Sequence, residues 1–187
     1  MIEQILTNLI QAALKDLENP VFKTDLDDWL SPCEALRDAQ YSYWYPSLQC
    51  PKMRFDGFET AIEQPVHTDL KAFYLSFWSG ALPCLFDALP ISLIQVWNPD
   101  DFDRLIGNFI GHYLVQKNAR QDLTLFIATV EDGGDNIISL DNGTGEVLLE
   151  TPGTPDRTIV APSLNQFLNR LRLEPERLNP IEMPRHD

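Results

Sequence analysis

Cysteine is scarce in this chain. Its 187 residues include only Cys33, Cys50 and Cys84, and no two of them form a Cys-x-x-Cys pair. An odd number at wide spacing predicts neither a disulfide framework nor a zinc knuckle. We therefore expect three reduced thiols and no covalent cross-link.

Long apolar runs are missing as well. The most hydrophobic stretch, residues 81–97, is interrupted by Pro83, Asp87 and Pro90, whereas a membrane-spanning helix needs about 20 consecutive apolar residues. The first 18 residues lack the basic segment of a signal peptide and instead predict an amphipathic helix. We expect no membrane span and no direct insertion into lipid.

The sequence patterns of common catalytic sites are also absent. The chain has no Gly-x-Ser-x-Gly elbow, no Walker phosphate loop, no Gly-x-Gly-x-x-Gly after a strand and no His-Glu-x-x-His. His67, Asp69 and His112 are candidate metal ligands, but a histidine within an amphipathic helix, such as His112, more often packs or forms hydrogen bonds. We therefore predict that the protein is not an enzyme and holds no metal ion or cofactor.

Positive charge is scarce relative to negative charge. There are 14 Lys and Arg residues against 28 Asp and Glu, which gives a formal net charge of -14. Such a surface repels nucleic-acid phosphates and anionic lipid headgroups, and it attracts basic partners. Solubility is the alternative explanation, although a small domain does not need this much charge to stay soluble. The composition argues against nucleic-acid binding and favours a basic protein partner.

Hydrophobic patterning predicts the strands. Residues 67–78 alternate between apolar and polar positions, and residues 124–130 form the continuous apolar run typical of a central strand. The turn sequences Gly133-Gly134 and Asn142-Gly143 connect this run to two more strands in a meander. The aromatic residues 41–45 predict either a strand or a packed loop. The predicted strands are residues 67–78, 91–97, 124–130, 136–140 and 146–150.

Helical periodicity and capping residues predict the helices. The longest has Asn98 at the N-cap, Pro99 at the first position, and Asp100 and Asp101 in the first turn. Asp56 followed by Glu59 resembles a capping box, which predicts a short helix that Pro65 ends. The predicted helices begin near residues 2, 56, 99 and 164.

Helices at both ends and consecutive strands in the second half predict an α+β fold with a mostly antiparallel or mixed sheet flanked by helices. We predict one domain over residues 1–173. Residues 174–187 are rich in proline and polar side chains, and we predict that they form a disordered tail.

Three groups of acidic residues are candidates for binding a basic partner. Asp100 and Asp101 lie beside Trp97 at a strand–helix junction, where stabilisation of the helix N-terminus is a sufficient explanation and the preferred one. The other groups lie in predicted loops, where charge is usually only solvated. The candidate partner-binding residues are Trp97, Asp100, Asp101, Glu131, Asp132, Asp25, Asp27 and Asp28.

Several motifs, in order along the chain, resemble the Syd family of SecY-interacting proteins from Gram-negative bacteria. The main one is QVWNPDDFDRLIGNFIGHYLVQK followed by TLFIATVED. The others are Ser31-Pro32-Cys33, DGFETAIEQPVHTDLKAFY, Gly145-Glu146-Val147 and SLNQFLNRL. The resemblance covers the chain up to about Leu173. The residues after Leu173 and the less basic segment 152–158 depart from the family pattern, so no role is carried over to the tail.

The resemblance implies a non-enzymatic binding protein with the α+β fold of the SUKH superfamily. Syd proteins attach to the cytoplasmic face of the inner membrane by binding cytosolic loops of SecY, the protein-conducting channel, and they are thought to restrain faulty translocase. Cytoplasmic loops of membrane proteins are rich in Lys and Arg, so a strongly acidic protein is a complementary partner. The alternative, from another functional class, is an immunity-type protein that neutralises a basic toxin.

Overall fold

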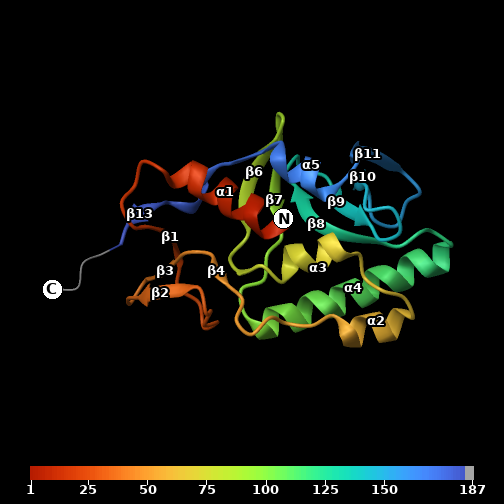
Figure 1. Cartoon of the computed structure of the whole chain (residues 1–187), viewed down its shortest axis with the longest axis horizontal. Coiled ribbons are helices and arrows are strands. Elements are labelled where there is room, and N and C mark those ends of the chain that lie inside the picture. The colour runs from red at the N-terminus through yellow and green to blue at the C-terminus, as the bar shows by residue number, and fades with distance from the viewer. Residues whose placement is uncertain (184–187) are drawn as a thin grey trace.

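A seven-stranded antiparallel sheet forms the centre of the fold (Figure 1). The computed structural model describes residues 1–183, and it places the strands in the order β11-β10-β9-β8-β7-β6-β12. Strand β8 therefore occupies the middle position, which confirms the prediction of a central strand over residues 124–130. The strands are β6 (Leu82–Phe86), β7 (Leu89–Leu93), β8 (Thr124–Val130), β9 (Ile137–Asp141), β10 (Val147–Glu150), β11 (Arg157–Ala161) and β12 (Leu171–Leu173).

The predicted meander is confirmed. Strand β8 pairs with β9, and β9 pairs with β10, in antiparallel register with Leu125 opposite Leu140 and Ile138 opposite Leu149. In the second turn, the Asp141 carboxylate accepts the backbone N–H groups of Gly143 and Thr144, both at 2.8 Å. The short polar turns thus fix the register that buries the apolar side of each strand.

A smaller antiparallel sheet lies beside the large one (Figure 1). Its order is β13-β1-β3-β2, and a separate pair is formed by β4 and β5. Trp44 on β3 is 1% exposed, and its ring contacts Phe22 with centroids 5.0 Å apart. The small sheet therefore contributes large aromatic side chains to the core. These strands are β1 (Pro20–Asp25), β2 (Glu34–Arg37), β3 (Tyr41–Trp44), β4 (Ser47–Leu48), β5 (Phe77–Trp78) and β13 (Ile181–Glu182).

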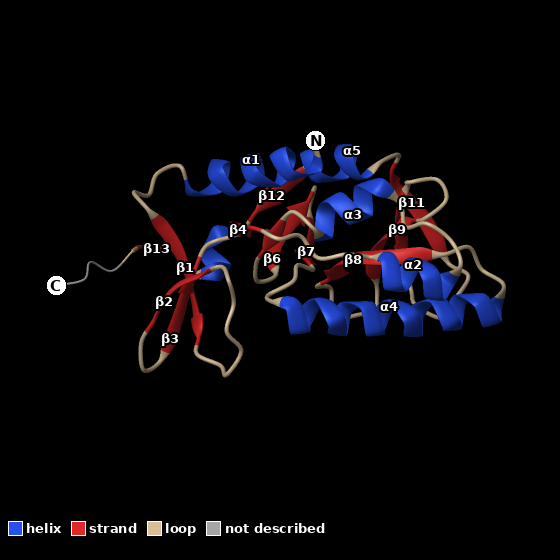
Figure 2. Cartoon of the chain, turned by 60° about the horizontal axis from the view of Figure 1, so that its bottom comes forward, coloured by secondary structure: helices blue, strands red, loops and turns tan. Residues whose placement is uncertain are grey.

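Helices pack against the sheets. Figure 2 shows α1 and α5 along one edge of the molecule, α4 with α2 along the opposite edge and α3 between them, and Tyr74 of α3 contacts Phe109 of α4 with ring centroids 5.7 Å apart. In α4, the Asn98 side chain accepts the N–H of Asp101 at 2.8 Å, and the buried face includes Phe102, Leu105 and Phe109. This confirms the predicted capped amphipathic helix. The helices are α1 (Ile2–Leu14), α2 (Asp56–Ile62), α3 (Thr68–Tyr74), α4 (Pro99–Ala119) and α5 (Leu164–Asn169).

The strand predicted over residues 67–78 is wrong for most of its length. Residues 68–74 form helix α3, and only Phe77 and Trp78 are in a strand. His67 caps the helix, because its Nδ1 atom accepts the N–H of Asp69 at 3.2 Å. Leu70, Phe73 and Tyr74 are then buried at helical spacing. The apparent alternation arose because apolar residues fill several faces of this short segment, which makes the period ambiguous.

The capping box predicted from Asp56 and Glu59 is also wrong, although the helix exists. Asp56 is the first helical residue, and the N-cap is Phe55, whose side chain makes no capping hydrogen bond. The Glu59 carboxylate instead accepts the N–H of Val66 at 2.8 Å and pairs with Lys71 at 2.7 Å. It therefore ties α2 to α3 rather than to its own N-terminus.

Residues 174–183 have defined structure, which differs from the disordered tail predicted for them. A 3-10 helix, η1 (Pro175–Leu178), follows β12, and β13 pairs with β1. The Glu174 N–H donates to the Pro83 carbonyl at 2.8 Å, and Leu178 is buried. The composition of this segment is typical of disorder. Burial of Leu178 and pairing with the free edge of β1 nevertheless give it a defined structure. Residues 184–187, including His186, lie outside the described residues.

Most of the buried apolar residues form one connected cluster. It joins Leu6 of α1, Phe22 of β1, Phe109 of α4 and Phe167 of α5. Within residues 1–183, no helix is long and apolar enough to cross a membrane. The predicted α+β class is confirmed, whereas the boundary between a domain of residues 1–173 and a separate tail remains a prediction.

Candidate functional site

A hollow of about 510 Å³ lies where residues 26–31, which we call the acidic loop, meet the N-terminal end of α4. Its lining combines Asp27, Asp28 and Trp29 of this loop with Trp97, Asp101 and Arg104 from the start of α4 and the residue that leads into it. Three carboxylates and one guanidinium give the lining a formal excess of two negative charges. We call this hollow the acidic pocket.

The residues before α4 hold the backbone of the acidic loop. The Trp97 indole Nε1 donates to the Trp29 carbonyl at 3.0 Å, and the Asn98 side-chain amide donates to the Leu30 carbonyl at 2.8 Å. The Ser31 hydroxyl donates to the Trp97 carbonyl in return. Side-chain donors thus satisfy loop carbonyls that no strand or helix partner satisfies, so the loop has a fixed place on α4.

Arg37 of β2 holds the loop from the other side. Its guanidinium donates to the Asp27 carbonyl at 2.9 Å and to the Trp29 carbonyl at 2.6 Å. Glu34 orients Arg37 through an ion pair of 2.7 Å. Burial alone would raise the pKa of Glu34, but hydrogen bonds from Arg37 and Ser42 hold it below its ordinary value. The loop backbone is therefore anchored by a charged pair that stays ionised near neutral pH.

The two aspartates at the start of α4 differ in their contacts. Asp101 accepts the Trp97 N–H at 2.9 Å with one carboxylate oxygen and pairs with Arg104 at 2.6 Å with the other. Asp100 is exposed and does not line the acidic pocket. Asp101 therefore combines a structural contact with a place in the pocket, whereas Asp100 faces solvent in the first turn.

We expect Asp101→Ala to lower the free energy of unfolding by about 1 kcal/mol, because the change removes an acceptor of a backbone N–H as well as a charge near the helix N-terminus. Asp100→Ala removes only the charge, so its effect should stay below about 0.5 kcal/mol. Urea denaturation of the two variants tests this. Equal losses would show that the Trp97 contact contributes nothing to stability.

The other predicted site residues lie outside the acidic pocket. Asp25 is the last residue of β1, opposite Tyr41. Glu131 donates its N–H to the Pro90 carbonyl at 2.9 Å and pairs through its side chain with Arg177 at 2.6 Å. Asp132 accepts the Gly134 N–H within its own turn, at 2.9 Å.

Strand β7 separates the two groups of candidates. Pro90, beside Glu131, lies near the start of β7, and Trp97 follows the end of that strand. The structure therefore brings together Trp97, Asp101, Asp27 and Asp28, and it places Glu131 and Asp132 by the opposite end of β7.

Two residues of the pocket were not among the sequence-based candidates. Trp29 is 39% exposed, and Arg104 lies over its ring with the guanidinium carbon 5.1 Å from the ring centroid. A sequence signal existed for Arg104, because it follows Asp101 by three positions in a helix, the spacing of an intrahelical ion pair. No comparable signal placed Trp29 against α4, since 68 residues separate it from Trp97.

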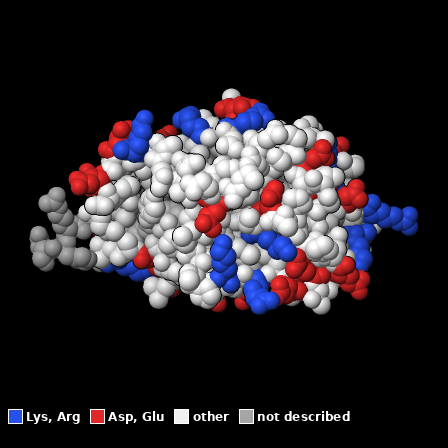
Figure 3. All heavy atoms as spheres, viewed as in Figure 1, with Lys and Arg blue, Asp and Glu red and all other residues white. Residues whose placement is uncertain are grey.

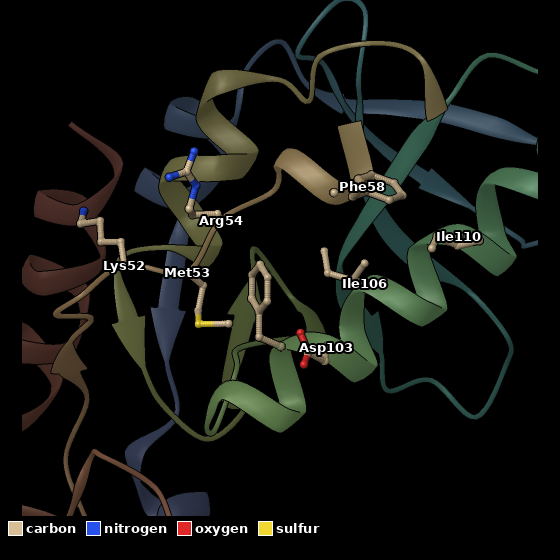
Figure 4. A pocket seen from close by; sticks show the side chains of 9 residues that line it. Lys52, Met53, Arg54, Phe58, Asp103, Ile106 and Ile110 are labelled. Carbon is tan, nitrogen blue, oxygen red and sulfur yellow. The ribbon is translucent and has the colours of Figure 1, made fainter. Parts of the chain in front are cut away.

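A second hollow, of about 440 Å³, lies between α2 and α4. Figure 4 shows Met53 directed toward α4, with Phe58, Ile106 and Ile110 along the floor. Lys52 and Arg54 point away from α4 in the same view, and Asp103 lies at the rim. This groove is mainly apolar and brings no set of polar groups to one point, so it does not define a chemical site.

The two described histidines have structural partners. His67 caps α3, and His112 Nε2 lies 2.8 Å from the Gln116 side-chain nitrogen, in line with the expectation that His112 forms hydrogen bonds. Within residues 1–183, no three His, Cys, Asp or Glu side chains are placed to hold a metal ion. Burial raises the pKa of the Cys33 and Cys84 thiols to about 12, so both are poor nucleophiles at neutral pH.

The charge on the face of the molecule seen in Figure 1 does not form one continuous patch. Figure 3 shows acidic and basic side chains interspersed on this face, with uncharged stretches between them. On this face the negative charge is therefore not gathered in one place. The acidic pocket stands out through its combination of carboxylates and tryptophans rather than through a general excess of negative charge.

These features define the class of the molecule: an α+β protein with an acidic, aromatic-walled pocket on its surface. The family model described as Syd protein (SUKH-2) matches residues 1–174. The chain belongs to this family.

Individual relatives agree with this assignment. The chain is 42% identical over 138 residues to Protein Syd of Pectobacterium carotovorum, an alignment that covers 74% of this chain and 75% of the relative. It is 38% identical over 142 residues to Protein Syd of Aliivibrio fischeri, covering 75% and 76% of the two chains. For Protein Syd of Psychromonas ingrahamii, the identity is 35% over 162 residues, or 86% of each chain. The names of these relatives indicate no enzymatic activity.

Proposed function

We propose that the protein binds basic cytosolic loops of the SecY translocation channel through the acidic pocket and thereby restrains abnormal or excess SecY, without catalysing a reaction. The observation that carries this proposal is the convergence of Asp27, Asp28 and Asp101 with two tryptophans on one hollow. Membership of the Syd family supports the choice of partner, since the resemblance implies SecY-interacting proteins.

The chemistry of the pocket suits a lysine or arginine side chain. Carboxylates attract the charge, and a tryptophan face adds a cation–π interaction worth about 0.5–1 kcal/mol at an exposed site. Arg104 pairs with Asp101, so Asp28 and the second carboxylate oxygen of Asp27, whose Oδ1 accepts the Trp29 N–H at 2.7 Å, are left to a cation from a partner. Leu26 and Leu30, which are 39% and 69% exposed, flank these aspartates and offer apolar contacts beside the charges. A basic segment that also carries apolar residues therefore fits best.

The same proposal accounts for a peripheral place on the cytoplasmic side of the inner membrane. A net charge of -14 repels anionic headgroups, so SecY rather than lipid would hold the protein there. Opposite charges on the two partners would speed their association and make the affinity dependent on salt.

The test compares charge removal inside and outside the pocket. We expect the double variant Asp27→Asn/Asp28→Asn to bind synthetic peptides of the SecY cytosolic loops about tenfold more weakly, because two charges that face the ligand are lost. Calorimetry or stopped-flow fluorescence measures the affinity, and most of the loss should lie in the association rate. Asp132→Asn, in the turn by the other end of β7, is the matched control and should bind as the unmodified protein does.

Membrane flotation provides the second readout of the same prediction. The unmodified protein should float with vesicles that contain SecY but not with protein-free anionic vesicles, and rising salt should weaken the association. Binding to protein-free vesicles, or normal peptide binding by the double variant, would refute a SecY interaction through this pocket.

A further inference from the structure

The acidic pocket already contains a cation that belongs to the protein itself. The Arg104 guanidinium pairs with Asp101 at 2.6 Å and lies over the Trp29 ring, with its central carbon 5.1 Å from the ring centroid. A carboxylate on one side and an indole face on the other are the two contacts that a guanidinium from another protein would use. Arg104 therefore occupies a site with the chemistry of an arginine receptor.

The receptor is held firmly, whereas its occupant is not. The Asp101 side chain is 15% exposed and fixed by the Trp97 N–H, and the Trp29 carbonyl accepts hydrogen bonds from both Trp97 and Arg37. The Arg104 side chain is 65% exposed. Exposed ion pairs of this kind contribute roughly 0–1 kcal/mol, so Arg104 can leave at little cost while the carboxylate and the indole remain in place.

Displacement of Arg104 would also change the charge of the pocket. With Arg104 in place, its guanidinium offsets one of the three carboxylates in the lining. Once it swings into solvent, Asp101 joins Asp27 and Asp28 as an acceptor for an incoming cation. The pocket is thus most attractive to a basic partner when its own arginine has moved away.

We propose that Arg104 is an internal competitor that occupies the cation site of the acidic pocket and is displaced by an arginine of the binding partner. This inference rests on the proposed function, because it concerns the same pocket. It specifies the group recognised: a guanidinium, whose plane stacks on Trp29 and whose fork reaches Asp101, in preference to an ammonium. Arg104 also limits the affinity of the pocket. A partner gains only the difference in interaction free energy between its own arginine and Arg104 in the cation site.

The test uses two synthetic peptides that differ only in having three arginines or three lysines between glycine–serine flanks. Calorimetry and the fluorescence of the pocket tryptophans report binding to the unmodified protein and to three variants. Arg104→Gln removes the competitor. Arg104→Lys keeps its charge but loses the planar fork, and Lys117→Gln removes an equal charge about 20 Å further along α4, beyond the screening length at physiological salt.

We expect Arg104→Gln to bind the arginine peptide about three to ten times more tightly, which corresponds to the loss of one weak competing ion pair. Arg104→Lys should gain about twofold, because an ammonium competes less well for the indole and carboxylate. Lys117→Gln should remain within about twofold of the unmodified protein because its charge is screened. The unmodified protein should prefer the arginine peptide to the lysine peptide.

Unchanged or weaker binding by Arg104→Gln, while Asp27→Asn/Asp28→Asn still weakens binding, would overturn the competitor role and leave the proposed function intact. An equal gain from Lys117→Gln would also overturn it, because the effect would then be general electrostatics. If Asp27→Asn/Asp28→Asn binds normally as well, the pocket is not the binding site and both proposals fail.

Discussion

Glu150→Ala is expected to lower the free energy of unfolding by about 3–5 kcal/mol, because it leaves a partly buried arginine without its charge partner. The Glu150 side chain is 4% exposed and pairs with Arg157 at 2.9 Å. Its other oxygen accepts the Thr124 hydroxyl at 2.6 Å and lies 3.6 Å from His112 Nε2. The residue thus links β10 to β8, β11 and α4, and thermal or urea denaturation measures the loss.

Asp156→Ala is the matched control, because Asp156 is an exposed acid next to Arg157 in the sequence. Its effect should stay within about 0.5 kcal/mol, as for most surface substitutions. A comparable loss of stability in both variants would mean that removing any negative charge from this region lowers the free energy of unfolding, whether or not the charge belongs to the buried pair.

Acid should remove the contribution of Glu150. Burial alone would raise the pKa of this carboxyl, but the nearby His112 ring, the hydrogen bond from Thr124 and the charge of Arg157 lower it from 4.5 to about 2. A carboxyl with a lowered pKa stabilises the folded state fully above its unfolded pKa, and the contribution is lost as the pH falls through the folded value. The difference in stability between the unmodified protein and Glu150→Ala should therefore shrink as the pH falls from about 4.5 to about 2.

Gly80→Ala is expected to lower the free energy of unfolding by about 1–3 kcal/mol through overpacking. A methyl group at Gly80 would lie 2.8 and 2.9 Å from two ring atoms of Trp44. Trp44 is 1% exposed, and its ring packs edge-on against Trp97, with centroids 5.5 Å apart. The ring cannot move away without disturbing Trp97, so the variant should also weaken peptide binding in the acidic pocket.

Gly107→Ala is the matched control for this substitution. A methyl group there meets nothing within 4 Å, and the residue lies inside α4. Alanine should stabilise the helix by about 0.5–1 kcal/mol, because glycine is the poorer helix former. If Gly80→Ala were as stable as the unmodified protein, the close approach of Gly80 to Trp44 would not constrain the core.

Local signals in the sequence determined much of the fold. Asn98 and Pro99 fixed the start of α4, and Gly133-Gly134 and Asn142-Gly143 fixed the turns of the meander, because caps and tight turns depend on a few adjacent residues. The periodicity of apolar residues gave a wrong prediction where the segment was short. Residues 68–74 fit both a helix and a strand, and packing of Leu70, Phe73 and Tyr74 into the core decided between them.

The acidic residues proposed for binding show the same division between local signals and tertiary contacts. From the sequence, Glu131 and Asp132 were candidates on equal terms with Trp97, Asp101, Asp27 and Asp28. Only the pairing of β7 with β8 and of Glu131 with Arg177 separated the second group from the first. Sequence alone shows that a residue is acidic and lies in a loop, whereas its neighbours depend on contacts between distant segments.

By itself, the sequence determined the α+β class, the family, the central strand, the capped helix and the acidic character of this protein, because composition and local periodicity carry that information. The tertiary structure decided which carboxylates share a pocket, that Trp29 forms one wall of it and that Arg104 lies inside it. Those facts depend on hydrogen bonds from Trp97 and Asn98 to loop carbonyls 68 residues away. Backbone carbonyls are present at every residue and leave no mark in the sequence.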